Sequence, residues 1–540
     1  MIRHLNFNIL TIFFFIIYLI SGSLIFNDYV VTPDEELHRI NGLISLKYIF
    51  NLFSIDISNI EEFRLVPNLY DDWRKTYGVL FDLPTSFIQF YFKINTQDIF
   101  LIRHYLTFII FFISNIYFYR LIKNNLKNEK LALLGVFILT TSPRLFSHSF
   151  FNSKDILFLS FLIIAVYYCI KLLQKTNVKY FILASIFCAF ASNIRIIGIY
   201  LPVLTLFFFY FKEENKKKIN TLKFFIIFFV YYFGFLYLTW PYLWLNPINN
   251  FLLILKESAS YPIHWDFKTL YLDNYLNPQN IPWHYFFVWF ASTTPISFLL
   301  IIIMGVFLFL KEYLKFFFEI NFDSNVSIWS NENQKINLFI FLNFFIPIFF
   351  VICLNSTLYN GWRHLFFLYP FLIYLSLYGL KKISYYISYN FFRFIILLLI
   401  VQISSNILFI QKSHPVQNIY FNFFAKNILA DKMPIDYWGL GNKKTIDFLL
   451  LKKNEFSISN SSFTPLHYLK YSKRNDFPYS KAITFNGTSL KNKSLSDFIF
   501  TNYYYNQNPM NIEKFNIPKN YKSYYKLIID DLIVNEVFIK

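Results

Sequence analysis

The feature that most constrains this chain is a series of long apolar runs that recurs from Phe7 to Phe409. Each run is close to the roughly 20 residues that an α-helix needs to cross about 30 Å of hydrocarbon. Hydrophobic residues make up 56% of the 540 residues, which is not typical of a soluble protein. The sequence therefore predicts an α-helical polytopic membrane protein. About eleven spans are expected, at 8–27, 99–119, 131–147, 154–172, 180–194, 197–211, 224–243, 285–309, 336–354, 364–380 and 392–410.

The positive charges follow the loops between these spans. The net charge is +18, but the Lys and Arg residues are not gathered in one patch, so nucleic acid is not an expected partner. Alternate loops are basic, which is typical of cytoplasmic loops in membrane proteins. This pattern predicts a cytoplasmic amino terminus and, with an odd number of spans, a carboxyl terminus on the opposite side. The basic loops lie at 120–130, 171–179, 212–223, 311–335 and 381–393.

Two domains are expected. Residues 1–410 form the membrane domain, and its first outer loop, 28–98, is long enough to hold helices that lie on the membrane surface. Residues 411–540 are polar and domain-sized, and they predict a small α/β domain outside the membrane. The first apolar run precedes no Ala-x-Ala site, so we interpret it as a retained helix and not as a signal peptide.

Ionisable residues collect at the outer ends of the predicted spans. Acidic residues include Asp34, Glu35, Asp82 and Asp155, and a comparable set of cations lies near them in the predicted topology. So many charges beside hydrocarbon predict a polar cavity at the outer face. Cations would hold a lipid phosphate, and a carboxylate would remove a proton from an acceptor, so the set suits group transfer from an anionic lipid. The remaining candidates are His38, Arg103, His104, Lys154, Arg195, Arg363 and His364.

Each candidate also has a structural interpretation. Asp34 follows Pro33 and could cap the amino end of a helix, and a single Arg such as Arg103 or Arg363 often anchors a helix end. Lys154 and Asp155 could cap a helix, and histidines such as His38 are more often structural than ligands. No metal-binding spacing is present, so no cofactor is required by the sequence, and a divalent cation is left open without support.

Four motifs resemble those of glycosyltransferases with the GT-C fold, which use polyprenyl-phosphate-linked sugars. The resemblance is to glycosyltransferase family 39, including protein O-mannosyltransferases and lipid A aminoarabinose transferases, and covers the membrane part of the chain. Two further elements after the last span, HPVQNIYFN (414–422) and DYWGLGNKK (436–444), also look like family elements but have no assigned role. The four motifs are PDEELH (33–38), LIRHYLTF (101–108), TSPRLFSHSFFNSKDILF (141–158) and YNGWRHLFFLYPFL (359–372).

The resemblance implies roles for the candidate residues. Asp34 would be the catalytic base and Glu35 its helper, and the later motifs would contact the donor phosphate or sugar. The large insertion of eukaryotic protein O-mannosyltransferases is missing, which weakens the case for a protein acceptor. The implied substrate contacts are His38, Arg103, His104, Lys154, Asp155, Arg195, Arg363 and His364.

The sequence thus predicts an inverting glycosyltransferase in the inner membrane of a bacterium. It would move a sugar from a polyprenyl-phosphate donor to an envelope acceptor at the periplasmic face, and the carboxyl-terminal domain would be periplasmic. Its partners would be the lipid-linked donor, an acceptor that the sequence does not name, and the bilayer. The alternatives are an O-antigen ligase or polymerase that uses lipid diphosphate donors, and a transporter or flippase. A transporter is disfavoured because no internal repeat is visible and the charges gather at one face.

Overall fold

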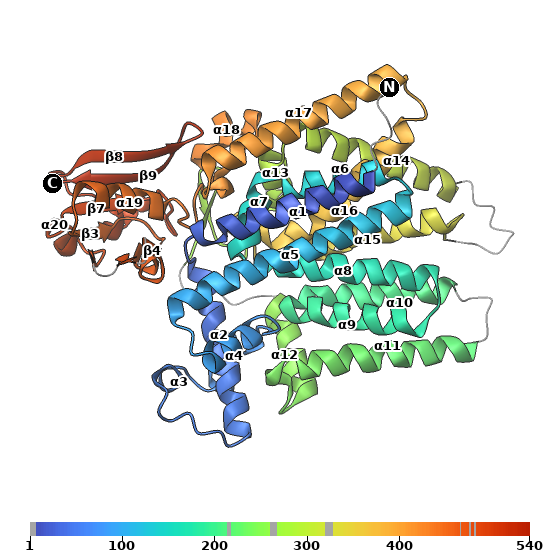
Figure 1. Ribbon diagram of the computed structural model, residues 1–540, viewed down its shortest axis with the longest axis horizontal. Coiled ribbons are helices and arrows are strands. Elements are labelled where there is room, and N and C mark those ends of the chain that lie inside the picture. The colour runs from blue at the N-terminus through green and yellow to red at the C-terminus, as the bar shows by residue number, and fades with distance from the viewer. Residues whose placement is uncertain are drawn as a thin grey trace.

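The computed structural model describes residues 7–212, 218–259, 267–318, 328–464, 466–474, 477–479 and 482–540. A bundle of long helices forms most of the molecule, and a smaller region with strands follows at one end (Figure 1). The first turns of α1 and the carboxyl terminus lie at opposite ends of the bundle (Figure 1). Parts of the basic loops at 213–217 and 319–327 lie outside the described residues.

Among the described residues, seven helices are long and apolar enough to cross a membrane. The bent pair α6 and α7 gives an eighth candidate, and shorter apolar helices cover the other predicted runs, so the polytopic helical fold is confirmed. The long helices are α1 (Phe7–Ile25), α5 (Thr96–Leu126), α8 (Asp155–Gln174), α14 (Ile296–Phe318), α15 (Glu332–Cys353), α16 (Tyr369–Ile383, preceded by a 3-10 turn, Arg363–Leu368) and α17 (Tyr389–Ser413). The other bundle helices are α6 (Glu129–Thr140), α7 (Pro143–Phe151), α9 (Val178–Ile194), α10 (Tyr200–Lys212), α11 (Lys218–Leu238) and α13 (Tyr285–Thr293).

Two predicted spans are broken at prolines. The run at 131–147 is divided between α6 and α7, which meet at an angle of 70° where Pro143 begins α7. The run at 285–309 is divided between α13 and α14 at Pro295. Proline lacks a backbone donor and is favoured at the first turn of a helix, so each break falls where a new helix can start.

The bundle has a buried centre and apolar outer helices. In the apolar segment of α8, 78% of the residues are buried inside the protein. In α1 the corresponding share is 17%, and side chains such as Ile12 and Phe13 are exposed. Helices α14 and α16 approach closely because both carry glycine: a Cβ at Gly379 would lie 2.6 Å from the Cα of Gly305. Apolar side chains that face outward from a bundle are expected where lipid is the solvent.

The first outer loop contains the predicted helices. Helix α2 (Pro33–Leu52) packs against α4 (Asp82–Tyr91), with α3 (Glu61–Leu65) beside them, at the end of the bundle near the strand-containing region (Figure 1). A second long loop at this end holds α12 (Pro247–Ala259) and a hairpin of β1 (Thr269–Tyr271) and β2 (Asn274–Leu276).

The carboxyl-terminal region is the predicted α/β unit. Its five-stranded sheet has the order β6-β3-β7-β9-β8, in which β3 is parallel to β6 and β7 and the other pairs are antiparallel. The strands are β3 (Phe456–Asn460), β4 (Lys473–Arg474), β5 (Phe477–Pro478), β6 (Ile483–Asn486), β7 (Phe498–Thr501), β8 (Lys522–Ile529) and β9 (Leu532–Ile539), and the helices are α18 (Phe423–Leu429), α19 (Asn442–Lys452) and α20 (Leu490–Ser494).

Candidate active site

Asp34 lies in the first turn of α2. Thr32 is the N-cap residue, and the carboxylate of Glu35 accepts hydrogen bonds from the Thr32 N–H at 2.8 Å and from Thr32 Oγ1 at 3.1 Å. The alternative that Asp34 caps this helix is therefore wrong. The Asp34 side chain does not cap the helix and is 35% exposed, so its carboxylate is available for other contacts.

Glu35 has a different environment from Asp34. Its second carboxylate oxygen lies 2.7 Å from His104 Nε2, and both side chains are almost completely buried. His104 Nδ1 lies 3.4 Å from the carbonyl oxygen of Phe26, at the end of the first span. Glu35 and His104 thus join the start of α2 to α5. These contacts suit a Glu35 that holds the first turn of α2, and with it Asp34, in place.

Asp34 begins a chain of alternating charges. Arg363 Nη1 lies 2.9 Å from Asp34 Oδ2 and 3.5 Å from Asp155 Oδ2, and Arg195 donates a hydrogen bond to the other oxygen of Asp155. Arg363 is 4% exposed, whereas Arg195 is 28% exposed. Asn152 orients Asp155 by donating a hydrogen bond to it at 2.8 Å. Four predicted site residues from α2, α8, the end of α9 and the turn before α16 are therefore brought together.

Arg195 reaches this chain because of a helix break that the sequence predicts. Helix α9 ends at Ile194, Arg195 has extended backbone angles, and a short 3-10 turn (Ile196–Ile199) leads into α10. Two short helices therefore meet at this end of the bundle in place of one long span. The break places the guanidinium beside Asp155 and not in hydrocarbon.

Aromatic rings enclose Arg363. Its guanidinium carbon lies 4.7 Å from the Trp438 ring centroid and 5.0 Å from the Tyr359 ring centroid. The Tyr359 ring also packs edge-on against His364, at 4.8 Å, so His364 is next to the ion pairs without contacting them directly. A cation between two aromatic faces is stabilised by their quadrupoles. These rings fix the position of Arg363.

Trp438 belongs to the DYWGLG element, whose role the sequence left open. Asp436 is buried and accepts hydrogen bonds from the backbone N–H groups of Leu440 and Gly441, at 3.0 and 2.8 Å. Its carboxylate also accepts from Asn418 Nδ2 at 3.0 Å, which ties it to the HPVQNIYFN element. The two elements form one buried turn that holds Trp438 over Arg363.

A second charge cluster surrounds Asp82, at the start of α4. Arg103 donates to Asp82 Oδ1 at 2.7 Å and to Thr85 Oγ1 at 2.6 Å, and it is 1% exposed. Lys154, which precedes α8, lies 3.7 Å from Asp82 and donates to the carbonyl oxygen of Gly78 at 2.6 Å. Arg103 and Lys154 thus tie Asp82 and the loop that carries it to α5 and α8. That Arg103 contacts a lipid phosphate stays a prediction.

Burial and these neighbours shift the pKa values in the second cluster. Burial would raise the pKa of Asp82, but the charges of Arg103 and Lys154 outweigh it, so that the pKa is lowered. Burial lowers the pKa of Lys154 to about 8, although Asp82 opposes the change. Burial, with help from the nearby cations, lowers the pKa of His38 to about 3, so its imidazole is neutral near pH 7.

The loop that carries Asp82 is fixed by a close backbone approach. A Cβ at Gly78 would lie 1.7 Å from the backbone oxygen of Asn193, so only glycine fits there. Asn193 Oδ1 accepts from the Leu80 N–H at 3.0 Å, and its amide donates to the Thr239 oxygen at 3.1 Å. This contact joins residues far apart in the chain, so the sequence alone does not reveal it.

Two cavities bear on where a substrate could bind. A small cavity of about 10 Å³ lies beside Pro33 and Trp438, and a larger one, of about 410 Å³, lies at the other end of the bundle. Within the described residues, no group of three or more His, Cys, Asp or Glu side chains is placed to hold a metal ion. The charged residues predicted to meet at one face do meet, but the cavity beside them is small, so the predicted polar cavity is not open in this arrangement.

Comparisons with known proteins bear on the predicted resemblance. The profile of the dolichyl-phosphate-mannose-protein mannosyltransferase family matches residues 83–244, a segment that includes Arg103, Lys154, Asp155 and Arg195. No curated protein matches the chain. The crystal structure of ArnT from Cupriavidus metallidurans bound to undecaprenyl phosphate is similar with a TM-score of 0.43 and 10% identity, over 99% of this chain and 98% of that one. Over residues 83–244, the predicted resemblance to mannosyltransferases is confirmed, and this segment has the sequence pattern of a glycosyltransferase.

Proposed function

We propose that this chain is an inverting glycosyltransferase that moves a sugar from a polyprenyl-phosphate lipid to an envelope acceptor. The observation that carries the proposal is the partly exposed Asp34 carboxylate, held 2.9 Å from the buried Arg363 guanidinium. A carboxylate that can accept a proton and a cation that can hold a phosphate are thus adjacent, as this reaction requires.

Asp34 is the proposed base. It takes the proton of the acceptor hydroxyl or amine, while the acceptor oxygen or nitrogen forms a bond to the anomeric carbon of the donor sugar. The bond between that carbon and the phosphate oxygen breaks, and its electron pair leaves on the phosphate. Attack from the face opposite the phosphate inverts the configuration at the anomeric carbon.

Arg363 and Arg195 are the proposed phosphate contacts. Arg363 is fixed between aromatic rings, and Arg195 is partly exposed at the same cluster, so both can meet an anion that enters there. Guanidinium groups stabilise the charge that develops on a departing phosphate, which then leaves without being protonated. No cofactor is needed for this chemistry.

The ion pair between Asp34 and Arg363 suggests that the donor binds before Asp34 acts as the base. While they are paired, the Arg363 guanidinium occupies the Asp34 carboxylate at 2.9 Å, where an acceptor would otherwise approach. A donor phosphate competes for Arg363 and releases Asp34 next to the reacting carbon. The base is therefore active only when the donor is bound, which limits wasteful reactions.

The remaining predicted residues are proposed to position this centre. Glu35 and His104 hold the first turn of α2, and Arg103 and Lys154 hold the Asp82 loop. His38 is neutral beside this loop and can donate a hydrogen bond to a sugar hydroxyl. Asp155 pairs with Arg363 and Arg195, and His364 supports the Tyr359 ring that lies against Arg363.

The proposed location is the inner membrane of a bacterium, with the site at the periplasmic face. The alternation of basic loops supports a cytoplasmic amino terminus, and the first turns of α1 and the carboxyl-terminal region are at opposite ends of the bundle (Figure 1). In this orientation the membrane domain is 1–410, and the domain at 411–540 is periplasmic and packs over the site.

The experiment that tests this function measures donor cleavage. The purified chain in nanodiscs is mixed with an envelope extract and with a radiolabelled sugar on undecaprenyl phosphate or on undecaprenyl diphosphate. We expect covalent transfer from the monophosphate donor. Transfer from the diphosphate donor alone, or no covalent transfer from either donor, would overturn the proposal. Mass spectrometry of envelopes from cells with and without the chain then identifies the sugar and the acceptor.

A further inference from the structure

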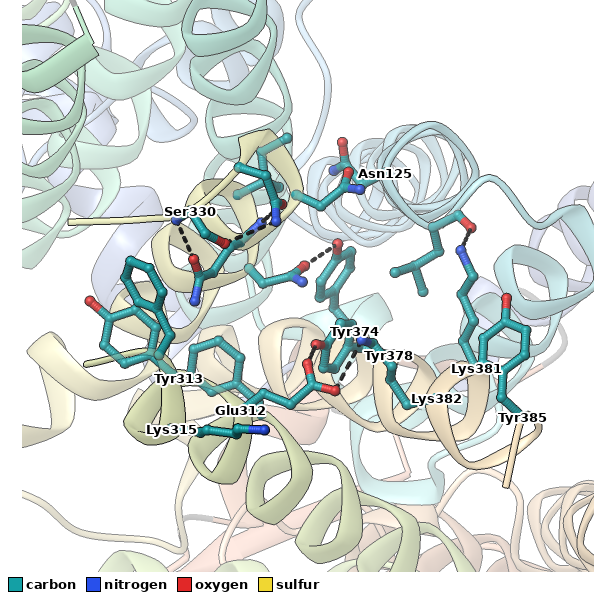
Figure 2. Close-up of a pocket in the computed structure, with 18 residues that line it drawn as sticks. Asn125, Glu312, Tyr313, Lys315, Ser330, Tyr374, Tyr378, Lys381, Lys382 and Tyr385 are labelled. Carbon is teal, nitrogen blue, oxygen red and sulfur yellow. Dashed lines mark hydrogen bonds and ion pairs between the residues drawn. The ribbon is translucent and has the colours of Figure 1, made fainter. Parts of the chain in front are cut away.

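A second polar site lies far from the Asp34 cluster. Figure 2 shows a cavity of about 410 Å³ between the ends of α5, α14 and α16 and the start of α15. Tyrosine, asparagine and lysine side chains line it, which is an unusual lining for the gap between apolar helices. Its volume is within the range of ligand-binding pockets.

The position of this cavity relates it to the membrane. Asn125 lines the cavity and follows Arg103 by 22 residues on the single helix α5, which corresponds to about 33 Å at 1.5 Å per residue. The hydrocarbon core of a bilayer is about 30 Å thick. The cavity and the Asp34 cluster therefore lie at opposite membrane interfaces, and the cavity is at the level of lipid headgroups.

The charge of the lining is positive. Lys315, Lys381 and Lys382 face a single acid, Glu312, across the cavity. Glu312 is already paired, because Lys382 lies 2.9 Å from it and the Tyr378 hydroxyl donates to it (Figure 2). Among the described residues, Lys381 has the carbonyl oxygen of Leu126 as its hydrogen-bond partner, at 2.8 Å, and no carboxylate. An anion in the cavity would therefore meet a charge on Lys381 that no carboxylate among the described residues compensates.

Neutral polar groups supply the rest of the lining. The Tyr374 hydroxyl donates to Asn337 Oδ1 at 2.9 Å, and Asn125 and Asn333 add further amides to the lining. Amide and phenol groups bind the oxygens of an ester or a glycerol. Together with the lysines, they form a site for a phosphate ester with hydroxyl groups.

The surroundings favour a lipid over a soluble ligand. The outer surface of α14 beside the cavity exposes Leu314, Phe317 and Phe318, and Tyr385 and Tyr386 are exposed at the end of α16. Apolar side chains next to exposed tyrosines are typical of the boundary between hydrocarbon and headgroups. An acyl chain can follow α14 while its headgroup enters the cavity.

We propose that this cavity binds the phosphate headgroup of an anionic glycerophospholipid from the leaflet opposite the Asp34 cluster. A basic pocket between helices at the cytoplasmic interface is a known physical solution for such headgroups. The bound lipid would join α5, α14, α15 and α16 at this end. The proposal does not depend on the sugar-transfer reaction.

The test uses the full-length chain, purified in detergent and examined by native mass spectrometry. Titration with phosphatidylglycerol, phosphatidylcholine or soluble glycerol phosphate separates an anionic lipid from a zwitterionic one and from a free phosphate ester. We expect phosphatidylglycerol to bind most tightly. Lys381→Gln keeps a donor for the Leu126 carbonyl but removes the charge, so its affinity should fall about fivefold.

A matched variant and a second pocket variant complete the test. Lys179→Gln makes the same charge change and should not alter binding. Lys179 is exposed near the end of the bundle that holds the cavity, where Gln174 donates a hydrogen bond to Asn125. Lys315→Gln, at the exposed rim, should weaken binding even if Lys381→Gln fails to fold. Equal binding of phosphatidylcholine, equal binding of glycerol phosphate, or an equal loss in Lys179→Gln would overturn the proposal.

Discussion

Replacing Arg363 with Gln tests whether this guanidinium holds the donor phosphate. The side chain is 4% exposed, and it lies 2.9 Å from Asp34 and 3.5 Å from Asp155. Removing one preorganised group that stabilises a developing negative charge typically lowers kcat by about 10²–10³. We expect a loss of this size in Arg363→Gln.

Arg363→Gln should also lower the free energy of unfolding, and the contacts of Arg363 allow the decrease to be estimated. Removing one partner of a buried ion pair costs about 3–5 kcal/mol. Asp155 keeps Arg195 as a partner and Asp34 is 35% exposed, so both carboxylates retain compensation. We therefore expect a smaller cost, of about 2 kcal/mol.

The assay measures both quantities on one preparation. Donor turnover at saturating donor gives kcat per folded molecule, and a thermal melt gives stability. Arg64→Gln is the control, since Arg64 is exposed in the first outer loop. Arg363→Lys restores the charge without the planar group that packs between Trp438 and Tyr359, and should recover part of kcat. A folded Arg363→Gln with wild-type kcat would refute the reasoning, because the residue would then be structural.

Three further predictions follow from individual contacts. Lys154 has a pKa near 8 and loses its charge above that pH, so the transfer rate should fall as pH rises through about 8, and Lys154→Arg should abolish this step in a pH profile. His104→Ala removes the partner of the buried Glu35 and should lower the stability of the chain by about 3 kcal/mol. A thermal melt of the purified chain should show a melting temperature several degrees lower, and His104→Gln should show a smaller decrease. Trp438→Ala removes one ring over Arg363 and should raise KM for the donor more than it lowers kcat, whereas Trp283→Ala, at an exposed position, should change neither.

Hydropathy was sufficient to locate the membrane helices because burial in lipid imposes a requirement on each segment separately. Each predicted run lies on one or two helices, and Arg195 was correctly placed at a helix break because one long span would have buried its charge. The same local logic did not predict the division at Pro295, although proline is a recognised helix start. Hydropathy also did not predict that α14 and α16 pack closely where Gly305 meets Gly379.

The candidate site was predictable as a set of residues but not as a set of pairs. The resemblance selected Asp34, Asp155, Arg195 and Arg363, which are in fact connected. It could not show that Arg103 belongs to Asp82, since the two come from separate segments and pairing depends on tertiary structure. The part played by Trp438 was hidden for the same reason, because Trp438 comes from the carboxyl-terminal region and meets Arg363 only in the tertiary structure.

The most direct test of the central claim is the release of polyprenyl phosphate from a lipid-linked sugar by Asp34→Asn. Asn keeps the size of Asp34 but cannot accept the acceptor proton, so the rate should fall by about 10²–10⁴. Asp71→Asn, the same change at an exposed position of the same loop, should leave the rate at the wild-type value. If Asp34→Asn releases polyprenyl phosphate as fast as the wild-type chain, Asp34 is not the base and the proposed mechanism is contradicted.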